Sequence, residues 1–388
     1  MRRCQSLRFR TTEHATVDFS ALLAGDEAVG REVVVEVLAA HLDHPVEIDD
    51  AEMQVLVHVS ADDWVRREKA CGAWGETAIN RLLANGLLLA EEDDSPRTRR
   101  DRQLREAAWQ DDCAVMHAFS RWSHDDSTAT QRESRPQSVD DMVAAFGPPP
   151  PHFHRRADAV ARVALDEPAR TPLDDLLERR ATCRNFDLAQ SVSAAQLSAL
   201  LKRVFGVRGM EELAPGAVAL KKNHPSGGGL HPTEAYLVVQ LAEGLAPGLY
   251  HYTVEAHALD LLRALSPDDA RAFAMTAVAG QDYFADAPVL LVMAARFARS
   301  MWKYRNHPKI YRAILLEMGH ISQNLYLTAT EMNLGAFITA AINEVEIEQA
   351  FGLEPMAEGP LCVCGFGARA KERVTVEFDP AHKVWADA

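Results

Sequence analysis

The chain has 388 residues, which is enough for two or three domains and at least one sizeable core. Its composition, 47% hydrophobic and 25% charged, is that of an ordinary globular protein and excludes collagen-like, wholly disordered and coiled-coil classes. A formal net charge of −15 argues against nucleic acid and anionic membrane surfaces as partners.

The cysteines and the apolar runs indicate the compartment. Six cysteines are scattered along the chain, unlike the dense framework of a small secreted domain. Only Cys362 and Cys364 lie close together, in an apolar stretch that predicts a buried strand, and no further ligands suggest a metal site there. The arginine-rich N-terminus has no apolar signal region, and the longest apolar run, residues 287–295, cannot span a bilayer. We therefore expect a cytoplasmic protein.

Residues 1–125 predict a small winged-helix-like domain. β-branched residues predict a strand over residues 31–39. Helices are expected over residues 49–59, from near Asp62, and over residues 75–85. A short strand over residues 87–90 then enters a charged turn. Three helices followed by a terminal hairpin are typical of the winged helix-turn-helix outline.

The charge of this first domain indicates what it binds. A winged helix can read DNA through its third helix, but here Arg81 is the only Arg or Lys in that helix and four acids follow it. Peptide or protein binding is therefore the leading interpretation, and a purely structural role is the alternative. Residues 95–111 are strongly charged and predict a solvated helix. Residues 126–156 contain four consecutive prolines and predict an extended linker.

Residues 157–388 predict an α+β domain. The expected helices cover residues 173–180, 194–205, a short stretch from Pro232, 267–279, 311–334 and 344–351. The expected strands cover residues 236–240, 249–252, 288–294, 361–365 and 373–378. Residues 311–334 are apolar on nearly all sides, which predicts a helix buried in the core and at a subunit interface.

Two segments of this domain have the residue types of a ligand site. Arg180, Thr182 and Arg184 suit a phosphate, because guanidinium forks and a hydroxyl donate charge-assisted hydrogen bonds to it. Three glycines within residues 225–229 let backbone N–H groups approach a flat or anionic ligand closely. Each pattern also occurs in ordinary solvated loops. His224 and His231 flank the glycines without other ligand types nearby, so we predict no metal.

These segments and the long helix resemble the nitroreductase-fold FMN proteins. The resemblance rests on R-x-T-x-R-x-F from Arg180, P-S-G-G-G-L-H-P-T-E-A-Y from Pro225, G-L-Y-H-Y from Gly248, the pair Lys303-Tyr304, and L-E-M-G-H-I-S-Q-N-L-Y-L-T-A-T from Leu316. It covers roughly residues 157–388 and points to the SagB-type branch, dehydrogenases that oxidise azoline rings in ribosomally made, post-translationally modified peptides. It implies a three-layer fold, with helices flanking a central mixed sheet, and an obligate homodimer with each flavin at the subunit interface.

The resemblance also implies which residues hold FMN. The phosphate would be bound by Arg180, Thr182 and Arg184, with Arg369 or Lys371 adding a further cation. The ring would lie over the turn made by Pro225, Ser226, Gly227, Gly228 and Gly229. The flavin edge would face the backbone of Thr339, Ala340 and Ala341, where relatives often have glycine.

Lys303 and Tyr304 match the branch's pair that serves in proton removal. Aromatising an azoline requires the loss of a carbon-bound proton and of a hydride, so a base must stand opposite the flavin. A nearby ammonium favours the phenolate form of a tyrosine. Adjacent residues on a helix do not face each other, so the backbone must be non-helical here if both side chains point into one site. The alternative is a basic exposed loop.

Three functions stay open. The leading one is an FMN-dependent dehydrogenase that oxidises azolines or related residues in a precursor peptide, with a cyclodehydratase or another maturation enzyme as a further partner. The second is a nitroreductase-type enzyme that uses NAD(P)H to reduce small molecules. The third is a non-catalytic subunit that holds a peptide or a partner enzyme.

Overall fold

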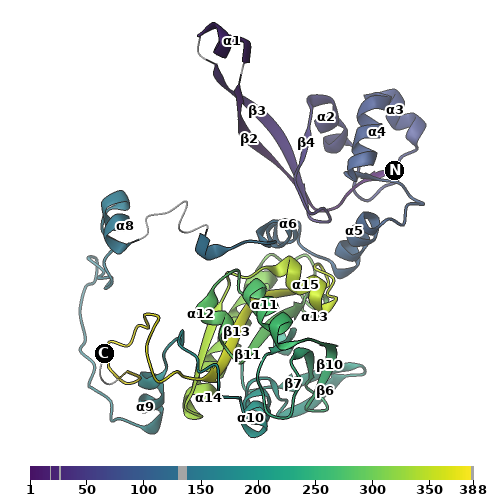
Figure 1. Ribbon diagram of the computed structural model, residues 1–388. Helices are drawn as coiled ribbons and strands as arrows, with labels where there is room; N and C mark the ends of the chain where they lie inside the picture. Colours follow the sequence, from purple (N-terminus) through teal and green to yellow (C-terminus); the bar gives the residue numbers. More distant parts are fainter. Residues whose placement is uncertain (18, 26–27, 130–137, 386–388) are drawn as a thin grey trace.

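A six-stranded sheet forms the centre of the computed structural model, which describes residues 1–17, 19–25, 28–129 and 138–385 (Figure 1). The strands lie in the order β10-β9-β8-β11-β13-β12. Their bounds are β8 Thr233–Val239, β9 Gly248–Thr253, β10 Ala258–Ala264, β11 Val289–Arg296, β12 Leu334–Thr339 and β13 Glu358–Ala368. All pairings between these strands are antiparallel. The expected mixed sheet is therefore antiparallel in its six strands, and an isolated parallel bridge joins Thr182 to Ala336 on β12.

Strand β11 explains why the domain has three layers. Its side chains from Val289 to Ala295 are completely buried, which is typical of a strand covered on both faces. Because successive side chains point to opposite faces, Leu291 and Met293 enter one core while Leu290 and Val292 enter the other. The sheet therefore separates two hydrophobic cores, each closed by helices.

Helices cover both faces of the sheet. On one face, α10 (Ala194–Phe205) and α14 (Lys309–Glu331) contribute to the core that contains Leu291. On the other face lie α11 (Pro267–Ala277), α12 (Asp282–Ala285) and α15 (Glu344–Phe351). The long helix α14 is buried along one side, but Leu315 and Leu316 on its other side are 43% and 66% exposed. These two leucines leave an apolar surface on the single chain.

The N-terminal region has its own small core. It contains β1 (Arg2–Arg3), β2 (Leu7–Val17), α1 (Phe19–Ala24), β3 (Val29–Ala39), β4 (Val46–Ile48), α2 (Asp50–His58), α3 (Arg67–Trp74), α4 (Glu76–Asn85) and β5 (Leu88–Leu89). Strands β2 and β3 form a long hairpin that projects away from the central sheet (Figure 1). The three expected helices are present. The expected terminal hairpin is wrong, because β5 pairs with β1 at the start of the chain.

Helices α5 (Pro96–Ala107) and α6 (Asp111–Ser120) join this region to the central sheet. Trp109, between them, is 1% exposed and donates from Nε1 to the Met356 carbonyl at 2.9 Å. On α6, His117 is hydrogen-bonded to the Tyr311 hydroxyl at 3.1 Å. After α6, Arg121 forms an ion pair with Glu348 at 2.6 Å. Residues 96–121 are thus packed into the same core as the sheet, although the sequence places them in the N-terminal domain.

Several predicted elements differ from the observed ones. The brief helix expected from Pro232 is strand β8, and residues 373–378 are irregular instead of a strand. The long helix ends at Glu331, because Asn333 adopts a left-handed conformation with φ 59° and β12 begins at Leu334. The segment expected as a linker contains α8 (Val139–Phe146). Among the described residues, no helix is long and apolar enough to cross a bilayer.

Candidate functional site

The glycine turn lies after the hairpin of β6 (Gly209–Ala214) and β7 (Ala217–Lys221) and contains the short 3₁₀ helix η1 (Gly227–Gly229). Gly228 and Gly229 both have φ 70°, a conformation that residues with a Cβ rarely adopt. A Cβ on Gly228 would also lie only 2.7 Å from the Tyr304 hydroxyl and 3.2 Å from Cδ of Lys303. This position therefore requires glycine for two separate reasons.

Lys303 and Tyr304 both reach the glycine turn. They lie in the turns and bends of residues 302–308 between α13 (Phe297–Met301) and α14. The N–H of Tyr304 still donates to the Ser300 carbonyl at 3.2 Å, as in a helix, so the fully non-helical backbone that a shared site was expected to need begins only after Tyr304. Nζ of Lys303 lies 5.6 Å from the centre of the Tyr304 ring. A hydrogen bond from the backbone N–H of Asn306 to the Ala108 carbonyl, at 2.9 Å, fixes this loop to the residue that follows α5.

A cavity of about 790 Å³ opens beside this loop and turn. It is lined by the β6–β7 hairpin, Gly228, Gly229, α13 and Lys303. Its charged lining residues include Arg296, which is paired with Glu234 at 3.0 Å, and Arg299, which donates to the Leu230 carbonyl. Lys303 makes no ion pair within the described part of the chain. Its ammonium is therefore available to a bound molecule.

The predicted phosphate residues follow α9 (Pro172–Arg179) in an extended segment. Ala181, Cys183 and Asn185 are buried, whereas Arg180, Thr182 and Arg184 are half-buried on the opposite side. This alternation of period two places the three predicted residues on one face. Thr182 Oγ1 is hydrogen-bonded to the Tyr326 hydroxyl at 3.0 Å, and the Arg180 guanidinium lies 5.3 Å from the centre of the same ring.

Neither Arg180 nor Arg184 has an acidic partner among the residues that the structure describes. The guanidinium of Arg184 instead lies 5.9 Å and 5.8 Å from the rings of Tyr283 and Phe284. Two guanidinium groups that pack on aromatic rings and lack carboxylates leave their N–H donors available for an anion. This arrangement suits the predicted phosphate.

Arg369 is differently placed. Its guanidinium forms an ion pair with Glu377 at 2.7 Å and donates to the Ala181 carbonyl at 3.0 Å. The Glu377 carboxylate is fully buried and also accepts hydrogen bonds from the backbone of Arg184 and Asn185. Burial would raise the pKa of Glu377, but these hydrogen bonds and Arg369 lower it overall. Arg369 therefore has a carboxylate partner where the sequence predicted a phosphate contact.

The remaining predicted residues lie at the end of β12. Thr339 Oγ1 accepts the N–H of Ala341 at 3.1 Å and is hydrogen-bonded to Gln281. Ala340 between them is exposed. The three backbone positions thus lie at one edge of the sheet.

The single chain does not bring the phosphate segment and the glycine turn together. Both contact α14, but at different points: Gly227 lies against Ala313, and Thr182 bonds to Tyr326. At 1.5 Å per residue, these contact points are about 20 Å apart along the helix. Tyr326 itself was missed from the sequence, where it counts as one more residue of an apolar helix. It could have been singled out because the hydroxyl of a tyrosine in a buried helix needs a hydrogen-bonding partner.

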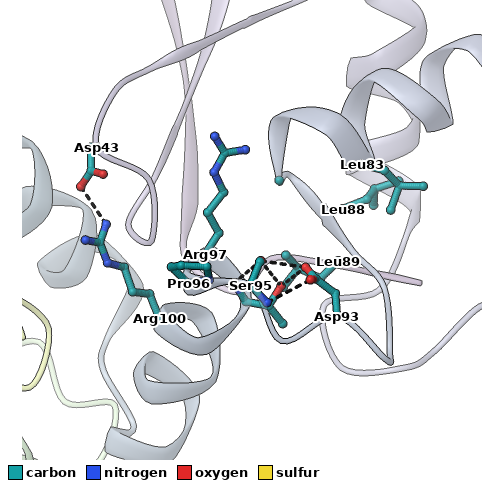
Figure 2. A pocket seen from close by; sticks show the side chains of 11 residues that line it. Asp43, Leu83, Leu88, Leu89, Asp93, Ser95, Pro96, Arg97 and Arg100 are labelled. Carbon is teal, nitrogen blue, oxygen red and sulfur yellow. Dashed lines mark hydrogen bonds and ion pairs between the residues drawn. The ribbon is translucent and has the colours of Figure 1, made fainter.

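A second cavity, of about 450 Å³, lies in the N-terminal region between α4, β5 and α5 (Figure 2). Its polar side chains are already paired. Asp93 accepts hydrogen bonds from Ser95 at 2.8 Å and from Thr98 at 2.5 Å, and Arg100 binds Asp43 at 2.8 Å. The cavity beside Lys303, which has an unpaired cation and a glycine-lined wall, is the better candidate for catalysis.

Residues 177–368 match the nitroreductase family. The chain carries a nitroreductase-family domain. The same region is similar to curated proteins from three organisms. A Methanocaldococcus jannaschii protein named as a nitroreductase is 28% identical over 197 residues, which is 51% of this chain and 91% of that protein. The trifolitoxin-processing protein TfxB of Rhizobium leguminosarum bv. trifolii is 28% identical over 219 residues, or 55% of this chain. The match spans only 58% of TfxB.

The microcin B17-processing protein McbC of Escherichia coli is 27% identical over 204 residues, which is 49% of this chain and 67% of McbC. Among solved structures, a chain of the Escherichia coli microcin synthetase McbBCD complex with truncated pro-MccB17 bound is similar to this one. The TM-score is 0.51 at 19% identity, covering 73% of this chain and 100% of that chain. This structural likeness confirms the predicted nitroreductase fold.

Proposed function

We propose that this protein is an FMN-dependent dehydrogenase that oxidises azoline rings, or closely related residues, in a ribosomally made precursor peptide. The observation that carries the proposal is the close approach of Lys303 and Tyr304 to Gly228, where Gly228 and Lys303 line the 790 Å³ cavity. A reductase of small nitro compounds needs no such base, whereas ring aromatisation does. The similarity to two peptide-processing proteins supports the same assignment.

FMN fits the residues that are present. Arg180, Thr182 and Arg184 would hold its phosphate, and the positive-φ glycines at 228 and 229 would let its ring approach the backbone. When bound, FMN would supply the acceptor for the hydride that leaves the azoline ring. Arg369 is a weaker candidate than the sequence suggested, because Glu377 occupies its guanidinium.

A homodimer would complete the site. The phosphate segment and the glycine turn contact α14 about 20 Å apart. A site that takes the phosphate residues from one protomer and the turn from the other would remove this separation. The exposed leucines 315 and 316 on α14 provide an apolar surface for such an interface.

The chain's own residues would handle the proton. Tyr304 would take the carbon-bound proton, and the Lys303 ammonium, 5.6 Å from the centre of its ring, would lie beside the reacting atoms. The apolar side chains of the β6–β7 hairpin, including Leu213 and Val218, would contact the peptide on either side of the ring. The N-terminal region and a cyclodehydratase or other maturation enzyme would bind the rest of the precursor.

The experiment compares Tyr304→Phe and Lys303→Ala with wild type. Both variants should keep full flavin occupancy, because the proposed FMN contacts lie on other residues. Oxidation of a synthetic thiazoline peptide should fall roughly 10²–10⁴-fold, as expected for the loss of a general base. Wild-type rates in both variants would contradict the proposed role of this pair.

The nitroreductase-type alternative is favoured by the similarity to the archaeal protein named as a nitroreductase. It predicts rapid NAD(P)H oxidation in the absence of any peptide. It also predicts that Tyr304→Phe leaves this oxidation unchanged. The two functions therefore differ in which reductant reaches the flavin.

A further inference from the structure

Three buried metal-ligand side chains meet behind the glycine turn. His224 precedes the turn, His231 follows it, and Glu317 comes from α14. The side chains of His224 and Glu317 are 1% and 2% exposed, and His231 is 7% exposed. Nδ1 of His231 lies 3.3 Å from Nε2 of His224, and that Nε2 lies 3.9 Å from Oε1 of Glu317. The sequence predicted no metal because it offered no third ligand near the two histidines.

The hydrogen bond on the outer side of the His231 ring determines which of its nitrogens carries the proton. Nε2 of His231 lies 3.1 Å from the Leu220 carbonyl, which can only accept, so this nitrogen carries the proton. Nδ1 of His231 therefore presents a lone pair to His224. On His224, Nδ1 is buried and makes no hydrogen bond among the described residues, so in the metal-free chain Nε2 can donate to Nδ1 of His231 at 3.3 Å. Moving that proton to the outer Nδ1 frees Nε2 for a cation.

With the His224 proton on Nδ1, two imidazole lone pairs and a carboxylate converge. Metal-binding histidines characteristically donate their other N–H to a backbone carbonyl or a carboxylate, and metal-binding carboxylates are themselves hydrogen-bonded. The carboxylate of Glu317 meets that pattern, because it accepts from the Thr233 hydroxyl at 3.0 Å. In a tetrahedral zinc site neighbouring ligand atoms are about 3.3–3.6 Å apart. The two histidine nitrogens already have this separation, His224 and Glu317 are 3.9 Å apart, and all three ligand atoms lie within 4.8 Å of one another.

We propose that His224, His231 and Glu317 form a structural site for one divalent transition metal ion, with zinc the ion that best suits two imidazoles and a carboxylate. The ion would join both ends of the glycine turn to α14. It would thereby hold Gly228 against Tyr304, outside the site that receives the flavin and the peptide. The proposal does not depend on the flavin or on the reaction.

Lys222 provides the competing explanation of the same cluster. Its side chain is buried, and its charge acts on both Glu317 and Glu234. If the cluster exists only as a buried ion pair, Lys222 is essential and no metal is needed. If the cluster binds zinc, the ammonium opposes the cation, so removing it should preserve or increase the zinc content. The variant Lys222→Met therefore separates the two explanations.

The test measures zinc per chain by plasma mass spectrometry after the protein has been incubated with zinc sulfate and desalted over a weak chelator. Wild type should hold about one zinc ion, and Lys222→Met should hold at least as much. His231→Asn and Glu317→Gln should lose zinc at least roughly 10-fold, whereas the matched change His58→Asn at an exposed histidine of α2 should have no effect. Circular dichroism checks that each variant is folded.

Cobalt substitution of the wild type gives a readout that needs no variant. Cobalt in a four-coordinate site with nitrogen and oxygen ligands shows intense visible absorption bands, which zinc should displace. Wild type that takes up neither metal, or variants at residues 231 and 317 that keep full occupancy, would overturn the proposal. Flavin content is measured on the same samples, so the failure of the metal site and the failure of the proposed function are distinguishable.

Discussion

Replacing Gly228 by alanine should uncouple catalysis from folding. The new Cβ would lie 2.7 Å from the Tyr304 hydroxyl, so the hydroxyl must retreat by about 0.7 Å to reach ordinary contact at 3.4 Å. Tyr304 is half-buried on the loop between α13 and α14, so the added methyl group would displace its side chain. A displacement approaching 1 Å in a catalytic group costs on the order of 10²-fold in rate. Gly228→Ala should therefore lose about that much peptide oxidation.

Gly229→Ala is the matched control. Gly229 has the same φ of 70°, but a Cβ on it would meet nothing within 4 Å. Both variants should lose about 1–2 kcal/mol of unfolding free energy, because an alanine in the left-handed region is strained. Only Gly228→Ala should lose the rate per bound flavin. The assay follows the loss of two hydrogens from a thiazoline peptide by mass spectrometry, with thermal melts in parallel. Equal rate losses in the two variants would refute the reasoning.

Three further outcomes are expected. Arg184→Ala should fold normally but lose the yellow colour of bound flavin, measured by absorbance after gel filtration. Burial raises the pKa of Glu344 to about 7. The stability that the protonated carboxyl group contributes is therefore present below about pH 4.5 and is lost as the pH rises to about 7. In thermal melts, Glu344→Gln should become increasingly more stable than wild type across that pH window. A truncated protein of residues 95–388 should fold alone, whereas one of residues 126–388 should not. The shorter protein lacks the buried Trp109 and α6, and so loses several core contacts worth about 3–5 kcal/mol each. Circular dichroism of the two truncated proteins checks this.

The parts of the fold that local pattern determines were predictable. Helix α10 has the predicted bounds because Ser193 caps its N-terminus and its apolar residues repeat at helical spacing. Strands β11 and β13 were predicted from their continuous apolar runs. Strand β12 was missed, because the apolar spacing of α14 continues at Met332 and the apolar residues of β12 begin two positions later. Met332 and the left-handed Asn333 separate the two elements.

Contacts between distant segments were not predictable in this way. The sequence gives no reason for Glu377 to bind Arg369, since residues 373–378 alternate like a strand yet wrap around Asn185 instead. Glu317 lies far from His224 in the chain, and only the packing of α14 behind the glycine turn brings them together. Trp109 and His117 fill the core of the nitroreductase domain from a segment that composition assigns to the N-terminal region.

The most direct test of the central claim uses flavin-loaded wild type without oxygen and without NAD(P)H. Addition of a thiazoline peptide should bleach the yellow flavin absorbance, and the peptide should lose two hydrogens for each flavin reduced. Tyr304→Phe, with the same flavin content, should bleach far more slowly. Bleaching by NAD(P)H but not by the peptide would contradict the account and would favour the small-molecule reductase.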